Sequence, residues 1–212
     1  MKPDIVIADD HLLVLEGLKR MVENECRVVG TATNGRELVT LADRLRPDII
    51  LLDVAMPLLN GIEAARQIKA RNPGMKFIFV TMQLSREYIR EAFEAGASGY
   101  VLKQAAASEL VAAIRQVSEG EFFLSPTACG RFLGYQPATH ENPSHLFSAL
   151  TPRQREVLQL VAEGRSAKQI ASLLFISIKT VEFHKKRLME ELNLGGTAEL
   201  VRYAVEHGWV AR

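Results

Sequence analysis

Apolar and polar positions alternate between two periods over the first 120 residues. Five short apolar runs, rich in β-branched residues, are each typical of a strand, and apolar residues at three- and four-residue spacing after each run indicate helices. The runs cover residues 4–8, 27–32, 48–53, 76–81 and 98–103. The helical segments cover residues 15–22, 38–45, 62–70, 88–93 and 110–117. Because the strands are apolar throughout, the pattern predicts an α/β fold with a doubly wound, five-stranded parallel sheet covered on both faces.

The pattern beyond residue 150 is purely helical. Thr151–Gln154 and Ser166–Gln169 have the form of capping boxes, and Ser177 is a third candidate helix cap. The predicted all-α four-helix domain has a first helix that Gly164 stops, followed by helices over 166–174, 178–192 and 197–207. Residues 120–148 show no sustained period and are interpreted as a linker with one short helix near 126–133. The domain limits expected are 1–120, a linker over 121–147, and 148–212.

Composition agrees with two parts that have different partners. The chain has 212 residues, is 48% hydrophobic and 24% charged, and carries a net charge of +1. Residues 1–150 hold 16 Lys and Arg against 18 Asp and Glu, whereas residues 151–212 hold 10 against 7. An acidic first part and a basic second part suggest separate functions.

The location expected is the cytoplasm. The two cysteines, Cys26 and Cys129, are too far apart in sequence for a metal motif and do not make a disulfide framework, which suits a reducing compartment. The N-terminus becomes acidic after seven residues, unlike a signal peptide. No stretch approaches the roughly 20 apolar residues of a membrane helix, so no membrane partner is expected.

Polar residues stand at the ends of four predicted strands. Asp9 and Asp10 end the first, Asp53 the third, Thr81 the fourth and Lys103 the fifth. Ligands of doubly wound sheets gather at this edge, so the five side chains should converge there. Three carboxylates favour a hard cation such as Mg²⁺, one carboxylate can become an aspartyl phosphate, and the hydroxyl and ammonium suit phosphoryl oxygens. The alternative is that these residues are unrelated turn caps.

These residues resemble the motifs of a two-component receiver domain over residues 1–120. The motifs are Asp9-Asp10, LLDVAMP, FVT and GYVLK. The resemblance implies a flavodoxin-like sheet with strand order 2-1-3-4-5 and a phosphoacceptor at Asp53. The implied Mg²⁺ ligands are Asp9, Asp10, Asp53 and the backbone carbonyl of Ala55. Thr81 and Lys103 would bind the phosphoryl group, and Thr81 and Tyr100 would form the switch. Met82 and Gln104 depart from the commonest receiver pattern, in which a smaller residue and a proline are frequent.

The helix predicted over 178–192 has two different sides. Val181, Leu188 and Leu192 fall on one side, and the opposite side carries Lys179, Glu182, Phe183, Lys186 and Glu190. Such a face suits the major groove of DNA, since Lys can contact guanine or phosphate, Glu can accept from cytosine and Phe can contact a thymine methyl. Arg165, Lys168, Lys185 and Arg187 are candidate phosphate contacts. A solvated mixed-charge face is an equally open interpretation from periodicity alone.

Residues 148–212 resemble a LuxR-type helix-turn-helix domain. The shared marks are LTPRQREVL, the KQIA helix and S-x-K-T-V-x-x-H. The resemblance makes 178–192 the recognition helix and the last helix a dimer surface. The DNA contacts expected are Lys168, Lys179, Thr180, Glu182, Phe183, Lys185, Lys186 and Arg187. Glu182 departs from the family pattern, in which a basic residue is common.

The two resemblances together identify the chain as a response regulator of the NarL/FixJ type. The implied function is not enzymatic: a sensor histidine kinase phosphorylates Asp53, and the chain, as a homodimer when phosphorylated, binds double-stranded promoter DNA. One alternative is a phosphorylation-independent DNA-binding regulator whose receiver only dimerises. A second is a hydrolase that uses an aspartyl phosphate, although the usual DxD motif after the first strand is missing.

Overall fold

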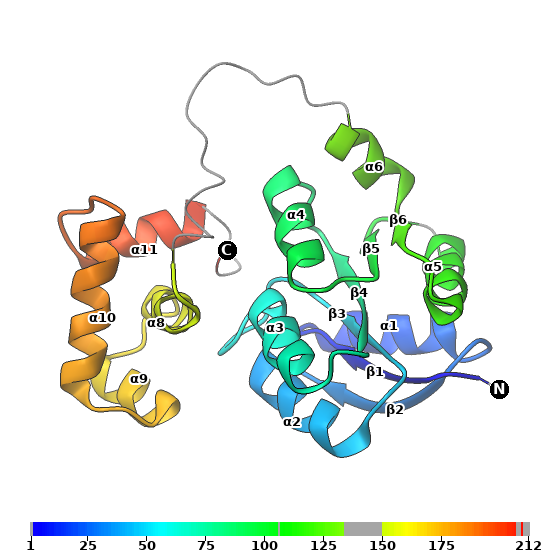
Figure 1. Ribbon diagram of the computed structural model, residues 1–212, viewed down its shortest axis with the longest axis horizontal. Helices are drawn as coiled ribbons and strands as arrows, with labels where there is room; N and C mark the ends of the chain where they lie inside the picture. The colour runs from blue at the N-terminus through cyan, green and yellow to red at the C-terminus, as the bar shows by residue number, and fades with distance from the viewer. Residues whose placement is uncertain (1, 106, 134–149, 207–208, 210–212) are drawn as a thin grey trace. The chain divides into compact units, whose positions relative to one another are not determined.

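The protein, described here by a computed structural model, consists of two compact units, Met1–Thr139 and His140–Arg212 (Figure 1). The structure describes residues 2–105, 107–133, 150–206 and 209. No helix in these ranges combines the length and apolar character needed to cross a membrane.

The first unit is built on a parallel sheet with strand order β2-β1-β3-β4-β5-β6. The strands are β1 (Asp4–Ala8), β2 (Arg27–Ala32), β3 (Ile49–Leu52), β4 (Lys76–Thr81), β5 (Gly99–Leu102) and β6 (Phe123–Leu124). The predicted parallel sheet and the order of its first five strands are confirmed. The expected number of strands is corrected by β6, which pairs with Gly99 and Tyr100 of β5. A strand of two residues shows no periodicity, so the sequence pattern did not reveal it.

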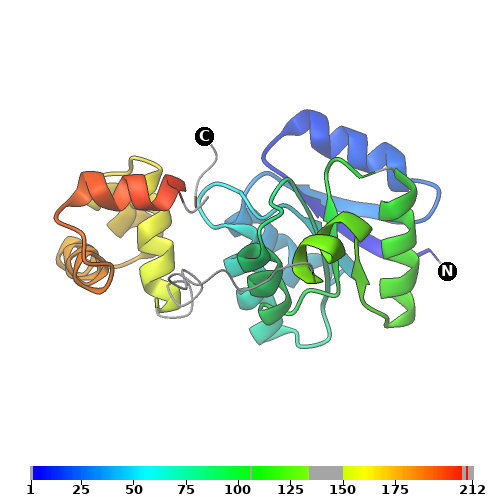
Figure 2. The same cartoon turned by 90° about the horizontal axis from the view of Figure 1, so that it is seen from above.

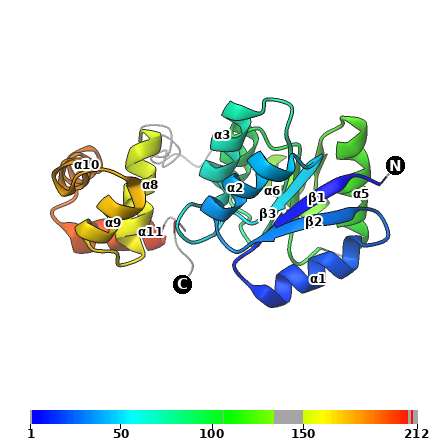
Figure 3. The same cartoon turned by 90° about the horizontal axis from the view of Figure 1, so that it is seen from below.

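Helices cover both faces of the sheet, as Figures 2 and 3 show. They are α1 (Leu12–Val22), α2 (Gly35–Leu45), α3 (Gly61–Arg71), α4 (Arg86–Glu94), α5 (Ala107–Glu119) and α6 (Pro126–Leu133). Helices α1 and α5 pack on one face, and α2, α3 and α4 pack on the other. Helix α6 contacts α4 and β5, so part of the segment interpreted as a linker is folded against the first unit.

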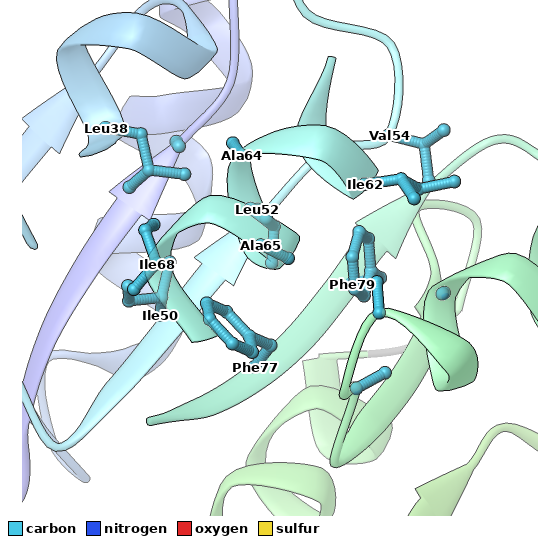
Figure 4. Close-up of a cluster of buried hydrophobic side chains, with 14 of the residues drawn as sticks. Leu38, Ile50, Leu52, Val54, Ile62, Ala64, Ala65, Ile68, Phe77 and Phe79 are labelled. Carbon is cyan, nitrogen blue, oxygen red and sulfur yellow. The ribbon is translucent and has the colours of Figure 1, made fainter. Parts of the chain in front are cut away.

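Successive strand residues supply two separate cores. Ile50, Leu52, Phe77 and Phe79 face α2 to α4, where Figure 4 shows them beside Ile68. Their neighbours along the same strands face α1 and α5 instead: Ile49, Leu51, Ile78 and Val80. Burying each such side chain contributes about 1.5–3 kcal/mol. This double burial explains why the strands are apolar at every position.

The second unit contains α8 (Pro152–Ala162), α9 (Ala167–Leu174), α10 (Ile178–Glu191) and α11 (Thr197–Glu206). Both expected capping boxes are present, Thr151 with Gln154 and Ser166 with Gln169. The Ser177 hydroxyl accepts a hydrogen bond from the Thr180 N–H at the start of α10. The four predicted helices are therefore confirmed, with ends that differ by one or two residues. Their contacts leave α10 supported by both α8 and α9.

Candidate functional site

The polar residues at the strand ends come from adjacent strands. Asp9 follows β1, Asp53 follows β3, Thr81 ends β4, and Lys103 follows β5. Because β1, β3, β4 and β5 are consecutive neighbours in the sheet, their carboxyl ends form one edge. The backbone extends this arrangement: the Asp53 N–H donates to the Ala8 carbonyl, and the Lys103 N–H donates to the Thr81 carbonyl. The sheet therefore places these four residues at one edge.

Lys103 joins two of the carboxylates. Its Nζ lies 2.6 Å from Asp9 Oδ2 and 2.6 Å from Asp53 Oδ2. The Lys103 side chain is only 12% exposed, and both carboxylates are buried. Burial by itself would lower the pKa of Lys103, but the charges and hydrogen bonds of Asp53 and Asp9 outweigh that effect and raise it. Lys103 therefore stays protonated and holds a positive charge between two acids.

Asp53 is held in place by the backbone around it. Its Oδ1 accepts a hydrogen bond of 2.6 Å from the Val54 N–H. Gly61 at the start of α3 packs directly beneath, since its N–H donates to the Val54 carbonyl. A Cβ added at Gly61 would lie 1.9 Å from the Asp53 carbonyl oxygen, so only glycine fits. Sequence spacing alone does not reveal this close approach.

Asp9, Asp10 and His11 form a cluster whose ligand atoms all lie within 4.8 Å of one another. The exposed His11 imidazole approaches Asp10 Oδ1 at 2.9 Å and Asp9 Oδ1 at 3.4 Å. With Asp53, three carboxyl groups of the described edge lie near the one ammonium of Lys103. The carboxyl oxygens of Asp9, Asp10 and Asp53 are the kind of ligand that a hard divalent cation prefers, whereas His11 would add a nitrogen.

Thr81 and Tyr100 are connected through the loop after β4. The buried Thr81 hydroxyl accepts a hydrogen bond of 3.3 Å from the Gln83 N–H. The Tyr100 hydroxyl donates to the Gln83 carbonyl at 2.8 Å, and its ring stacks on Phe79 with centroids 6.3 Å apart. Burial, followed by the nearby Asp53 charge, raises the pKa of Tyr100. Met82, between Thr81 and Gln83, is exposed.

A buried ion-pair network between α3 and α4 was also missed by the sequence analysis. Arg66 of α3 pairs with Glu91 of α4 and with Glu63 of its own helix, and both acids are buried. The acidic neighbours keep the pKa of Arg66 raised although burial opposes this. The only signal in sequence was a Glu and Arg three residues apart, which is usually a surface pair.

Helix α10 presents the expected face. Val181 and Leu188 are buried, while the polar side is exposed. The exposed residues include Lys179, Glu182, Phe183, Lys186, Arg187 and Glu190. Lys168 of α9 is exposed as well, whereas Thr180 and Lys185 are half-buried. The first turns of α10 therefore combine positive charge with an exposed aromatic ring.

Two contacts on this face limit how its side chains move. The Arg187 guanidinium lies 5.8 Å from the centre of the Phe183 ring, a cation–π contact. Lys185 Nζ lies 3.4 Å from Glu182 Oε1. Glu182, the acidic residue that departs from the family pattern, therefore forms an ion pair with a neighbouring lysine. His184 is half-buried, and burial lowers its pKa, followed by the charge of Arg153.

Two family models match this chain. Residues 5–115 match the response regulator receiver domain, and residues 148–204 match the bacterial regulatory proteins of the luxR family. Both matches fall on the units that carry the two sets of residues described above.

Similar proteins and solved structures span nearly the whole chain. The transcriptional regulatory protein MctR of Rhizobium johnstonii is 35% identical over 210 residues, covering 98% of this chain and 95% of MctR. The oxygen regulatory protein NreC of Staphylococcus aureus is 37% identical over 209 residues, covering 95% and 96%. The RcsB response regulator of Salmonella typhimurium superposes with a TM-score of 0.66 at 28% identity, covering 97% and 98%. A structure of the RcsB–DNA complex superposes with a TM-score of 0.61 at 27% identity, with the same coverage.

Proposed function

The chain belongs to the response regulators that join a receiver domain to a LuxR-type DNA-binding domain, and we propose that phosphorylation of Asp53 controls its binding to promoter DNA. This family consists of transcriptional regulators and not of enzymes. The proposed phosphoacceptor domain is residues 1–120 with β6 and α6 added, and the proposed DNA-binding domain is residues 148–212.

The observation that carries the proposal is Lys103 held 2.6 Å from both Asp9 and Asp53. An Asp53 carboxylate oxygen forms a bond to the phosphorus of a phosphohistidine on a sensor kinase. The phosphorus–nitrogen bond breaks, and the electron pair returns to the imidazole. Lys103 already lies at the acceptor, so its charge can pair with phosphoryl oxygens as they arrive.

Asp9, Asp10 and Asp53, together with the Ala55 carbonyl that the resemblance implies, would hold Mg²⁺. When bound, Mg²⁺ supplies positive charge that stabilises the phosphoryl oxygens. The acid pair also serves the fold, because Asp9 Oδ1 accepts a hydrogen bond of 2.9 Å from the His11 N–H at the start of α1.

Thr81 and Tyr100 would convert the new charge into a change of shape. A phosphoryl group on Asp53 offers the Thr81 hydroxyl a strong acceptor. Moving the Thr81 hydroxyl would break its hydrogen bond with the Gln83 N–H. Because the carbonyl of the same residue accepts the hydrogen bond from the Tyr100 hydroxyl, a shift of Gln83 would also affect Tyr100. Phosphorylation would thus shift an existing equilibrium between two arrangements of this loop and ring.

The second domain would then bind paired half-sites as a homodimer, as the RcsB dimers on DNA suggest by similarity. Lys179, Glu182, Phe183 and Lys186 would contact bases or adjacent phosphates, and the remaining contacts proposed are Lys168, Thr180, Lys185 and Arg187. Promoter DNA as a partner agrees with the expected cytoplasmic location.

The proposal is tested by incubating the full chain with Mg²⁺ and acetyl phosphate. Wild type and the control Asp43→Asn, an exposed α2 acid paired with Arg71, should incorporate phosphate, and Asp53→Asn should not. Promoter affinity should rise with phosphorylation in the first two proteins only. Equal phosphate incorporation in Asp53→Asn would contradict the proposed acceptor. Unchanged DNA affinity in a phosphorylated wild type would favour the phosphorylation-independent alternative.

A further inference from the structure

One acidic side chain stands among the basic residues of the α10 face that is proposed to bind DNA. Glu182 lies in the second turn of the helix, and its side chain is 53% exposed. Lys179, Lys186 and Arg187 are exposed on the same helix. These basic residues attract the phosphates of any DNA sequence, whereas a carboxylate is repelled by the phosphates. Glu182 therefore lowers the affinity for DNA unless a group of the bound base pairs compensates for its charge.

Lys185 holds the Glu182 carboxylate in place on its own helix. The Lys185 Nζ donates to Glu182 Oε1 at 3.4 Å, and the lysine side chain is only 18% exposed, so it has little freedom to move. Among the residues that the structure describes, Lys185 is the one partner of Glu182, and it uses Oε1. Oε2 is thus available to accept a hydrogen bond from DNA, at a position that the ion pair defines.

The base edges in the major groove differ in whether they can donate to a carboxylate. A carboxylate only accepts hydrogen bonds. Guanine and thymine present acceptor atoms in the groove, and adenine presents its N6 donor beside the N7 acceptor. Cytosine presents the N4 donor alone, so it can satisfy a carboxylate without placing an acceptor next to it. A carboxylate on a helix in the major groove therefore discriminates between the four bases.

We propose that Glu182 makes α10 selective for a cytosine in each half-site, chiefly by rejecting the other bases. The inference rests on the proposed function, in which the first turns of α10 enter the major groove. Cytosine N4 donates to Glu182, while Lys186, four residues further along the same side of the helix, donates to the paired guanine. At any other base the carboxylate lacks a donor and lies near the phosphates, which removes affinity that the lysines would otherwise provide.

Glu190 provides a matched control on the same helix. Its side chain is 51% exposed, and Lys186 Nζ lies 3.7 Å from its Oε1, so it is also a half-exposed acidic residue paired with a lysine. It stands about 12 Å further along the helix axis than Glu182, away from the N-terminal end that would enter the groove. Glu190→Gln and Glu182→Gln therefore remove the same charge, but only Glu182→Gln removes the proposed base contact.

Selection from a pool of random DNA duplexes tests the proposal with the full chain, incubated with acetyl phosphate and Mg²⁺. Wild type and Glu190→Gln should enrich the same sequence, with cytosine at one fixed position of each half-site. Glu182→Gln should enrich adenine at that position, because a glutamine amide can accept from N6 and donate to N7. An unchanged sequence in Glu182→Gln, or a change at a position where wild type prefers a base other than cytosine, would overturn the proposal. Failure of wild type to enrich any sequence would reject the proposed function itself, and the inference with it.

A cytosine analogue tests the single contact in the duplex that wild type enriches. 2-Pyrimidinone, which has the cytosine ring without the 4-amino group, replaces the cytosine of one half-site. The replacement should weaken binding about tenfold for wild type and Glu190→Gln, and less than about threefold for Glu182→Gln. Comparing two duplexes with the same protein cancels the general gain in DNA affinity that both variants obtain from the loss of a negative charge. An equal loss of affinity in all three proteins would show that cytosine N4 does not donate to Glu182 and would reject its role.

Discussion

A single lysine neutralises part of the acidic edge, so its removal should affect both chemistry and stability. Lys103→Met leaves Asp9 and Asp53 buried without their shared cation, at a cost of about 3 kcal/mol in the free energy of unfolding. Phosphate incorporation should slow by roughly a hundredfold, because the variant lacks the positive charge that would pair with the phosphoryl oxygens.

The pH dependence of this variant follows from the raised pKa of Lys103. A raised folded-state pKa means that the stabilisation is fully present below the unfolded-state pKa of about 10.4 and is lost as pH rises through the folded-state pKa. The difference in Tm between wild type and Lys103→Met should therefore be constant from neutral pH to about pH 10 and should shrink above it. A difference that persists undiminished at pH 12 would show that the ammonium charge is not its source.

Gly61 permits the turn that carries Asp53. Gly61→Ala forces a Cβ to within 1.9 Å of the Asp53 carbonyl unless the backbone moves. Overpacking of this kind costs about 1–3 kcal/mol, and the displaced Asp53 should also accept phosphate more slowly. Urea denaturation measures the first effect. The control Gly130→Ala, with open space around it, should instead gain up to about 1 kcal/mol. Equal stability of the two variants would contradict this account.

At the scale of elements, the Arg66–Glu91 pair connects α3 to α4 in a place where charge is costly. Arg66→Met removes the closest partner of a buried carboxylate and should lower the free energy of unfolding by about 3–5 kcal/mol. Adding Glu91→Gln should restore part of the loss, because the group left behind is then neutral. Chemical denaturation of both single variants and the double variant measures this coupling. Additive losses would mean that the two residues do not stabilise each other.

Helices and strands with strong periodicity or a clear cap could be predicted from the sequence, and the structure has them at approximately the predicted positions. The grouping of polar residues at the strand ends could also be predicted, because parallel strands place their carboxyl ends at one edge. The two-residue β6 could not be predicted, since it forms by pairing with β5. The burial of Glu91 could not be predicted either. An acidic residue on an amphipathic helix is expected to be exposed, and the sequence does not show which helix packs against it. The bridge that Lys103 makes depends on loop geometry, which spacing alone does not specify.

At the scale of the whole molecule, pairing two chains doubles every contact with DNA. The logarithm of DNA affinity falls linearly with the logarithm of salt concentration, with a slope of about −0.9 for each phosphate neutralised. Lys168 is exposed on α9 and is proposed to neutralise one phosphate in each copy. A monomer on one half-site would lose about 0.9 from this slope in Lys168→Ala, whereas a dimer on two half-sites would lose about 1.8.

Titrating labelled promoter DNA at several salt concentrations therefore counts the chains in the complex. Lys168→Ala should change the slope by about 1.8 for the phosphorylated protein. Arg71→Ala, which removes an exposed basic side chain of the first unit, should leave the slope unchanged. In the unphosphorylated protein, the change caused by Lys168→Ala should fall toward about 0.9 at protein concentrations below those that restore pairing. A change near 1.8 without phosphorylation would show that the DNA-bound dimer does not depend on a phosphoryl group at Asp53.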